Sequence, residues 1–175
     1  MQSISIIPIG QIDSEILRDI SEALQKAFHC RTGAHQEISI PPDALDAKRK
    51  QYHSTVILKE VKSLKPGNYT RALGVVDADL YVPELNFVFG EADIYSGVAA
   101  VISLTRLRQE FYGLKPDRKL FQLRAVKEAI HEIGHTYGLS HCQNPQCIMY
   151  FSNSIRETDK KGPGFCNTCR KKLNL

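Results

Sequence analysis

The residues that decide the fold are His131-Glu132-Ile133-Gly134-His135-Thr136-Tyr137-Gly138-Leu139-Ser140-His141. They close a stretch, from about residue 119 to residue 137, in which apolar side chains recur every three or four positions, the period of an amphipathic helix. On such a helix His131 and His135 project from one face, about 6 Å apart along the axis. The periodicity ends after Gly138, so we expect a long helix with two histidines near its end, followed by a loop-rich tail.

The spacing of the histidines is typical of a catalytic zinc site. Imidazoles at positions i and i+4 can both reach a zinc ion at about 2.0–2.1 Å. Gly138 can take the left-handed conformation that ends a helix and reverses the chain, which lets His141 approach the same ion as His131 and His135. Three protein nitrogens leave the fourth position open for water, whereas four protein ligands close a structural zinc.

Glu132 directly follows the first histidine and is the predicted general base. It can take a proton from the zinc-bound water as that water attacks a carbonyl, and later pass the proton to the leaving amine. Zinc lowers the pKa of its water from about 15.7 toward about 7. Incidental core and surface histidines are the alternative, but the five fixed positions coincide by chance only on the order of 10⁻⁵ in a chain of this size.

Four of the five cysteines gather near the C-terminus: Cys142, Cys147, Cys166 and Cys169. Two short-range pairs joined by a loop suit one zinc with four thiolate ligands, which leaves no open position and indicates a structural role. Such a site would order a tail that has little apolar core, because zinc binding of roughly 10–16 kcal/mol can supply folding free energy. Disulfides and an iron–sulfur cluster are the alternatives for these cysteines.

The two predicted metal sites adjoin each other, because His141 and Cys142 are consecutive. One backbone segment would therefore serve both ions. The formal net charge of +4 is also concentrated in the tail. Basic side chains there can offset the net charge of about −2 on a zinc with four thiolates, a solvated basic surface being the alternative; they are Lys160, Lys161, Arg170, Lys171 and Lys172.

The sequence before residue 119 alternates between strand and helix patterns. Asp13 can cap a helix that runs to Phe28, and a second helix is predicted over about 51–64. Cys30 reads as a small buried side chain at a helix end. The order βαβαβββ predicts an α+β domain with a mixed rather than a purely parallel sheet. The expected strands are 3–9, 35–40, 71–77, 86–89 and 97–104.

These motifs resemble the metzincin clan of zinc peptidases and, within it, the archaemetzincin family. In that family a cysteine follows the third histidine, then C-x-M and a late C-x-x-C; here these are Cys142, Cys147-Ile148-Met149 and Cys166-Asn167-Thr168-Cys169. The region 103–108 is also similar. The resemblance implies a zincin-like twisted sheet and active-site helix in residues 1–138, above a small zinc-stabilised part in residues 139–175, together one catalytic domain.

The resemblance also implies roles for residues outside the ligand set. Met149 would form the floor under the catalytic zinc, whereas the residues alone indicate a core side chain. The segment 86–89, close to Glu91 and Asp93, would be the edge strand that pairs with an extended substrate, an ordinary sheet edge being the alternative. Tyr150 receives no role, because its spacing from Met149 differs from that of the zinc-touching tyrosine of some metzincins.

We therefore predict a zinc metallopeptidase with two zinc ions per chain, acting as a monomer on peptides in extended conformation. A zinc-binding interaction module for nucleic acid and a zinc hydrolase of a non-peptide amide are the alternatives. The first leaves Glu132 unexplained and lacks an aromatic and basic stripe. Residues 1–10 lack the features of a signal peptide, and no apolar run of about 18 residues exists, so we expect a cytoplasmic protein without a membrane helix.

Overall fold

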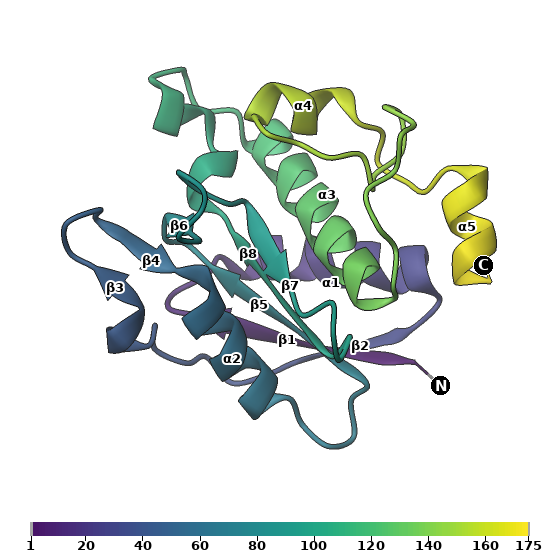
Figure 1. Ribbon diagram of the computed structural model, residues 1–175, viewed down its shortest axis with the longest axis horizontal. Coiled ribbons are helices and arrows are strands. Elements are labelled where there is room, and N and C mark those ends of the chain that lie inside the picture. Colours follow the sequence, from purple (N-terminus) through teal and green to yellow (C-terminus); the bar gives the residue numbers. More distant parts are fainter. Residues whose placement is uncertain (1, 175) are drawn as a thin grey trace.

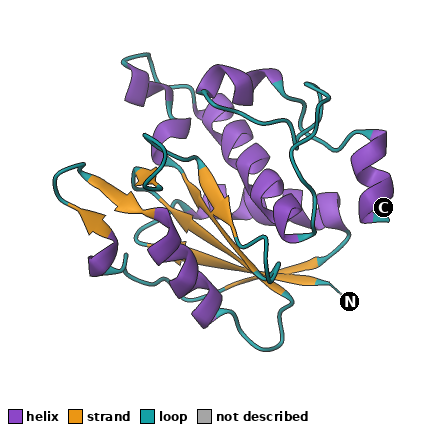
Figure 2. Ribbon diagram, viewed as in Figure 1, coloured by secondary structure: helices purple, strands orange, loops and turns teal. Residues whose placement is uncertain are grey.

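The computed structural model describes residues 2–174 and has a twisted, mixed five-stranded sheet at its centre (Figures 1 and 2). Its strand order is β2-β1-β5-β8-β7. Neighbouring strands run parallel except β7, which is antiparallel to β8, so the predicted mixed sheet is confirmed. The strands are β1 (Ser3–Ile9), β2 (Arg31–Ala34), β5 (Arg71–Val76), β7 (Gly90–Ala92) and β8 (Ala99–Ser103).

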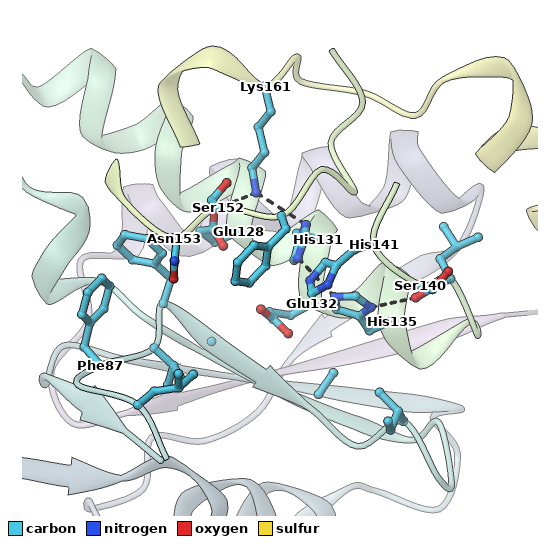
Figure 3. Close-up of a pocket in the computed structure, with 18 of the residues that line it drawn as sticks. Phe87, Glu128, His131, Glu132, His135, Ser140, His141, Ser152, Asn153 and Lys161 are labelled. Atoms are coloured by element: carbon cyan, nitrogen blue, oxygen red, sulfur yellow. Dashed lines mark hydrogen bonds and ion pairs between the residues drawn. The ribbon is translucent and has the colours of Figure 1, made fainter. Parts of the chain in front are cut away.

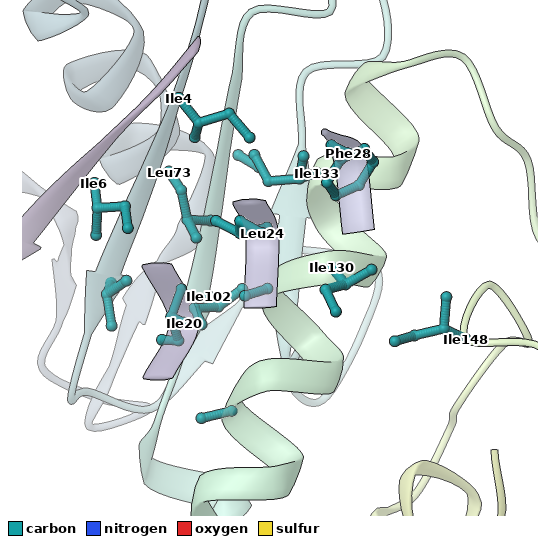
Figure 4. Close-up of a cluster of buried hydrophobic side chains, with 14 of the residues drawn as sticks. Ile4, Ile6, Ile20, Leu24, Phe28, Leu73, Ile102, Ile130, Ile133 and Ile148 are labelled. Atoms are coloured by element: carbon teal, nitrogen blue, oxygen red, sulfur yellow. The ribbon is translucent and has the colours of Figure 1, made fainter. Parts of the chain in front are cut away.

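Helices cover both faces of this sheet. Side chains alternate between the faces along each strand, so one strand contributes to two cores. Ile4 and Ile6 of β1 belong to a core formed with α1 and α3 (Figure 4), whereas Ile7 and Ile9 belong to a second core with α2. The central strands are therefore apolar on both sides, as expected for parallel strands between two helical layers. The helices are α1 (Ser14–Phe28), α2 (Ser54–Leu64) and α3 (Arg118–Thr136).

Shorter elements surround this framework. A small three-stranded sheet, which the sequence patterns did not reveal, lies beside the N-terminal end of α2. It consists of β3 (Leu45–Asp46), β4 (Gln51–His53) and β6 (Leu80–Tyr81). Single 3₁₀ turns are η1 (Pro42–Ala44), η2 (Thr105–Leu107) and η3 (Gln109–Tyr112), and the tail carries α4 (Ile155–Lys160) and α5 (Asn167–Leu173).

The predicted second strand is displaced along the sequence. It was expected at 35–40, after Gly33, but β2 ends at Ala34 and contains that glycine. A Cβ atom at Gly33 would lie 1.9 Å from Tyr69 Oη, so the strand needs a glycine where this ring crosses it. Beyond β2, the backbone nitrogen of His35 donates to the oxygen of Ile6, and Ile38 forms an isolated bridge with Ile9.

The predicted fourth strand is displaced in the same way. The apolar run 86–89 does not form the edge strand. The edge strand consists of the next three residues, Gly90–Ala92. They pair with Ala100, Val101 and Ile102 of β8. The predicted helix at 51–64 likewise begins only at Ser54, because the three preceding residues form β4. In residues 2–174 no helix has the length and apolar character that crossing a membrane requires.

Candidate active site and metal centres

The three histidines converge at the C-terminal end of α3 (Figure 3). Nε2 of His131 lies 3.1 Å from Nε2 of His135. His141 follows a turn at Gly138, where φ is 83°, and its ring centroid is 5.4 Å from that of His131 and 4.9 Å from that of His135. The structure thus brings together the three side chains whose spacing predicts a common ion.

Backbone carbonyls set the orientation of two of these rings. Nδ1 of His131 lies 2.8 Å from the oxygen of Ile148, and Nδ1 of His135 lies 2.7 Å from that of Leu139. A carbonyl oxygen can only accept a hydrogen bond, so each Nδ1 carries the hydrogen and each Nε2 keeps its lone pair. This is the tautomer in which Nε2 can bind a metal.

Desolvation favours the neutral form of the three imidazoles. Desolvation lowers the pKa of His131 well below its usual value, and the nearby ammonium of Lys161 lowers it further. Desolvation also lowers the pKa of His135 and of His141. Because a metal binds the neutral imidazole, protons compete only weakly for this site.

The donor set fits zinc. Two nitrogens at tetrahedral corners, each about 2.0–2.1 Å from zinc, stand roughly 3.3 Å apart, close to the separation between His131 and His135. One ligand atom from each histidine lies within 4.8 Å of the other two, and among the residues described no fourth His, Cys, Asp or Glu joins the cluster. Three imidazoles with a free position are the ligand arrangement of a catalytic zinc.

Glu132 lies beside the histidines and against the edge strand. A Cβ atom at Gly90, the first residue of β7, would come within 2.6 Å of Glu132 Cγ and 2.7 Å of the Val101 oxygen. A glycine at this position therefore makes room for the glutamate. Burial raises the pKa of Glu132 to about 8, and the carboxylates of Glu128 and Glu91 add to the rise.

The histidines and Glu132 open into a cleft of about 560 Å³. Most of the lining surface is apolar. The segment before β7 and the segment after Met149 contribute to it, and polar groups lie near the histidines. A pocket of this size with few polar groups is typical of a ligand site. The lining includes Leu85, Phe87, Phe89, Ile94, Leu139, Phe151, Ser152 and Asn153.

The region 103–108, noted for its family resemblance, supports one wall of the cleft. The guanidinium of Arg106 makes a bidentate pair with Asp79, with distances of 2.6 and 2.8 Å. It also stacks 4.2 Å from the ring centroid of Phe87, which lines the cleft. Arg106 thereby fixes an aromatic wall that no spacing rule reveals, because Phe87 and Arg106 meet only in the folded chain.

Met149 lies under the helix that carries the histidines. It is fully buried in the main core, and its sulfur would lie 2.5 Å from a Cβ atom at Gly134. Gly134 stands immediately before His135, so the methionine packs close to the turn that holds the ligands. Its position agrees with the core interpretation and is compatible with a floor beneath the site.

The four tail cysteines also form a cluster. Sγ of Cys142 is 3.7 Å from that of Cys166, and Sγ of Cys147 is 3.7 Å from that of Cys169. A disulfide has sulfurs about 2.05 Å apart, so neither pair is bonded. Thiolates around a tetrahedral zinc at about 2.3 Å stand roughly 3.8 Å apart, which matches these separations. All four sulfurs lie within 4.8 Å of one another.

A buried ion pair joins the tail to the active-site helix. Nζ of Lys161 lies 3.0 Å from Oε1 of Glu128 and 3.5 Å from Nδ1 of His131 (Figure 3). The interpretation of Lys161 as one of the basic residues that offset the thiolates is therefore replaced by a pairing with Glu128. A second pair, Arg124 with Asp159, is bidentate at 2.7 Å in both contacts.

Breaking the Lys161–Glu128 pair is expected to destabilise the protein. Lys161→Met removes the ion-pair partner of the buried Glu128 carboxylate, which keeps a hydrogen bond from the Thr158 hydroxyl at 3.3 Å, so the free energy of unfolding should fall by about 3–5 kcal/mol. Urea unfolding of the zinc-loaded protein measures the loss. Lys160→Met, at the exposed neighbouring position, serves as control and should change stability by less than about 0.5 kcal/mol. Equal stability of the two variants would contradict a structural role for the ion pair.

Comparisons with known proteins place the chain among related sequences. The model of peptidase family M54 matches residues 13–175. An archaemetzincin of Methanocaldococcus jannaschii is 45% identical over 171 residues, which cover 97% of this chain and 92% of the relative. An archaemetzincin of Pyrococcus furiosus is 44% identical over 177 residues, covering 97% of this chain and 91% of the relative.

Two solved structures have the same fold as this chain. The crystal structure of an archaemetzincin from Methanopyrus kandleri superposes with a TM-score of 0.87 at 36% identity and covers 99% of this chain and 93% of that one. A zinc-dependent peptidase from Methanocorpusculum labreanum gives a TM-score of 0.88 at 32% identity, with 98% and 100% covered.

Proposed function

Because the chain belongs to peptidase family M54, the archaemetzincin family, it is a zinc metallopeptidase, and we propose that His131, His135 and His141 hold its catalytic zinc while Glu132 acts as general base. The observation that carries this assignment is the convergence of three imidazoles beside a buried glutamate. In two of the rings the other nitrogen is already engaged by a backbone carbonyl.

The reaction follows from the position of Glu132. Zinc in this site would make a water molecule more acidic and polarise the carbonyl of the scissile bond. The carboxylate of Glu132 takes the proton that the attacking water releases. The protonated side chain can then pass that proton to the leaving amine. One residue thus serves as base and then as acid, held in place by its packing against Gly90.

Strand β7 is the proposed backbone partner of the substrate. It is the end strand of the sheet, so one of its edges is not paired with another strand in the described part of the chain. Its first residue lies against Glu132, so an extended peptide paired with β7 would run next to the catalytic group. Backbone pairing of this kind gives affinity with little dependence on side chains.

We further propose that Cys142, Cys147, Cys166 and Cys169 hold a second, structural zinc. Four thiolates complete a tetrahedral shell and leave no position for substrate. Thiols kept available for zinc favour a reducing compartment, in agreement with the expected cytoplasmic location.

Profiling cleavage of a diverse peptide pool by mass spectrometry tests the proposed activity. We expect the zinc-loaded protein to cleave a subset of the pool, a chelator to stop cleavage, and added zinc to restore it. Failure of the zinc-loaded protein to cleave any peptide, with two zinc ions bound per chain, would overturn peptide hydrolysis as its activity.

A further inference from the structure

The loop between β7 and β8 carries two exposed apolar side chains, one of which lines the cleft. Ile94 is 64% exposed and Tyr95 is 97% exposed. Single exposed apolar residues are common, but several of those in this chain gather around one opening, where Leu85, Ile94 and Phe151 all line the cleft. Tyr95 directly follows Ile94 and is not itself part of the cleft lining.

The loop is held in shape by Asp93. Its Oδ1 accepts hydrogen bonds from the backbone nitrogens of Tyr95 at 3.2 Å and Ser96 at 3.1 Å, and its Oδ2 contacts the hydroxyl of Ser96. Oδ2 also lies 2.7 Å from Nζ of Lys62 on α2. These partners, first the ammonium of Lys62, hold the pKa of Asp93 well below its usual value, so the carboxylate stays charged.

Gly97 closes the loop against the active-site helix. Its φ is 64°, and a Cβ atom there would lie 2.6 Å from the backbone oxygen of Thr136 at the end of α3. The loop is therefore anchored to α2 at one end and packed on α3 at the other. A rigid loop that presents exposed apolar side chains can bind a partner at low entropic cost.

The position of the loop relates it to the substrate. β7 begins at Gly90, against Glu132, and ends at Ala92, directly before the loop. β7 ends at Ala92 and residues 94–96 form a turn, so Gly90 and Ile94 are at most roughly 13 Å apart, the length of up to four substrate residues. A peptide lying along β7 therefore reaches Ile94 and Tyr95 about four residues from the scissile bond.

We propose that residues 93–97 form an exosite that binds an apolar side chain of the extended polypeptide substrate, about four residues away from the bond that is cleaved. This inference rests on the proposed function and adds a substrate class to it: unfolded or extended chains with large apolar residues at two separated positions. One would occupy the apolar cleft and the other would cover Tyr95.

Peptides with two anchors test the exosite without relying on turnover. Alanine–serine peptides of about 12 residues, which span roughly 40 Å, carry either one leucine or two leucines at spacings of one to six residues. Their affinity for the zinc-loaded Glu132→Gln protein is measured by fluorescence anisotropy. We expect binding to be about five- to tenfold tighter near a spacing of four than for the single-leucine peptide.

Tyr95→Ser in the same background should remove this gain and leave affinity for the single-leucine peptide unchanged. Leu114→Ser, at an exposed apolar position outside the cleft, should keep the gain. A flat dependence on spacing, or a gain that survives Tyr95→Ser, would overturn the exosite even if the wild-type protein cleaves peptides. Sedimentation that shows a dimer abolished by Tyr95→Ser would assign the loop to a second copy and also overturn it.

Discussion

Glu132→Gln should lower kcat/KM for a cleaved peptide by about 10² to 10⁴-fold while both zinc ions stay bound. Glutamine has nearly the same shape, so the packing against Gly90 persists. It cannot take a proton from water, and the general base is lost. Peptide turnover and zinc content per chain, measured on the same samples, check the prediction.

Glu91→Gln is the matched control for this experiment. Glu91 is a residue of β7 and also carries a carboxylate. The hydroxyl of Thr55 donates to this carboxylate at 2.8 Å, and Glu91 does not line the cleft. Its replacement should reduce kcat/KM far less than that of Glu132. Full activity of Glu132→Gln, or loss of zinc together with activity, would contradict the assigned role of Glu132 as a base that does not bind the metal.

The catalytic motif could be predicted from sequence because it is local. Helical geometry alone places His131 and His135 on one face, and Gly138 supplies the turn toward His141. The helix α1 was predictable for the same reason, since the cap Asp13 and the apolar period lie within one segment; the Asp13 carboxylate indeed accepts from the backbone nitrogen of Glu15.

What could not be predicted depends on contacts between distant segments. The apolar run 86–89 resembles a strand, yet Phe87 and Phe89 line the cleft and the next three residues, Gly90–Ala92, form the edge strand. Pairing with β8 and the space that Gly90 leaves for Glu132 decide which residues form the edge strand. Lys161 has the sequence context of a solvated basic tail, and only the fold shows that it is buried against Glu128.

Cys169→Ser is expected to weaken the catalytic site as well as the tail. A hydroxyl is a poor zinc ligand, so the structural zinc should be lost and the segment around Cys147 and Cys166 loosened. Cys147 directly precedes Ile148, whose carbonyl oxygen holds Nδ1 of His131 at 2.8 Å. Loss of such a supporting contact typically lowers metal affinity by about 10–100-fold, and we expect that range for the three histidines.

Two further bonds link the cysteine cluster to the histidines. The backbone nitrogen of Cys142, which follows His141, donates to the oxygen of Met149 at 2.9 Å. The nitrogen of Ile148 donates to the oxygen of Gly164, two residues before Cys166. The segment that carries His141 is therefore hydrogen-bonded to the segment that carries Ile148, the carbonyl partner of His131. Both segments are also connected to the cysteine cluster.

Competition with chelators of graded strength separates this coupling from independent sites. If the sites are coupled, Cys169→Ser should release its remaining zinc at a chelator strength that the wild type resists, and excess zinc should restore part of the peptidase activity. Cys30→Ala, which removes a buried thiol far from the cluster in sequence, should behave like the wild type. A variant that loses one zinc but holds the other as tightly as the wild type would show that the histidines do not depend on the cysteine cluster. The shared segments from His141 to Met149 would then be rigid enough on their own.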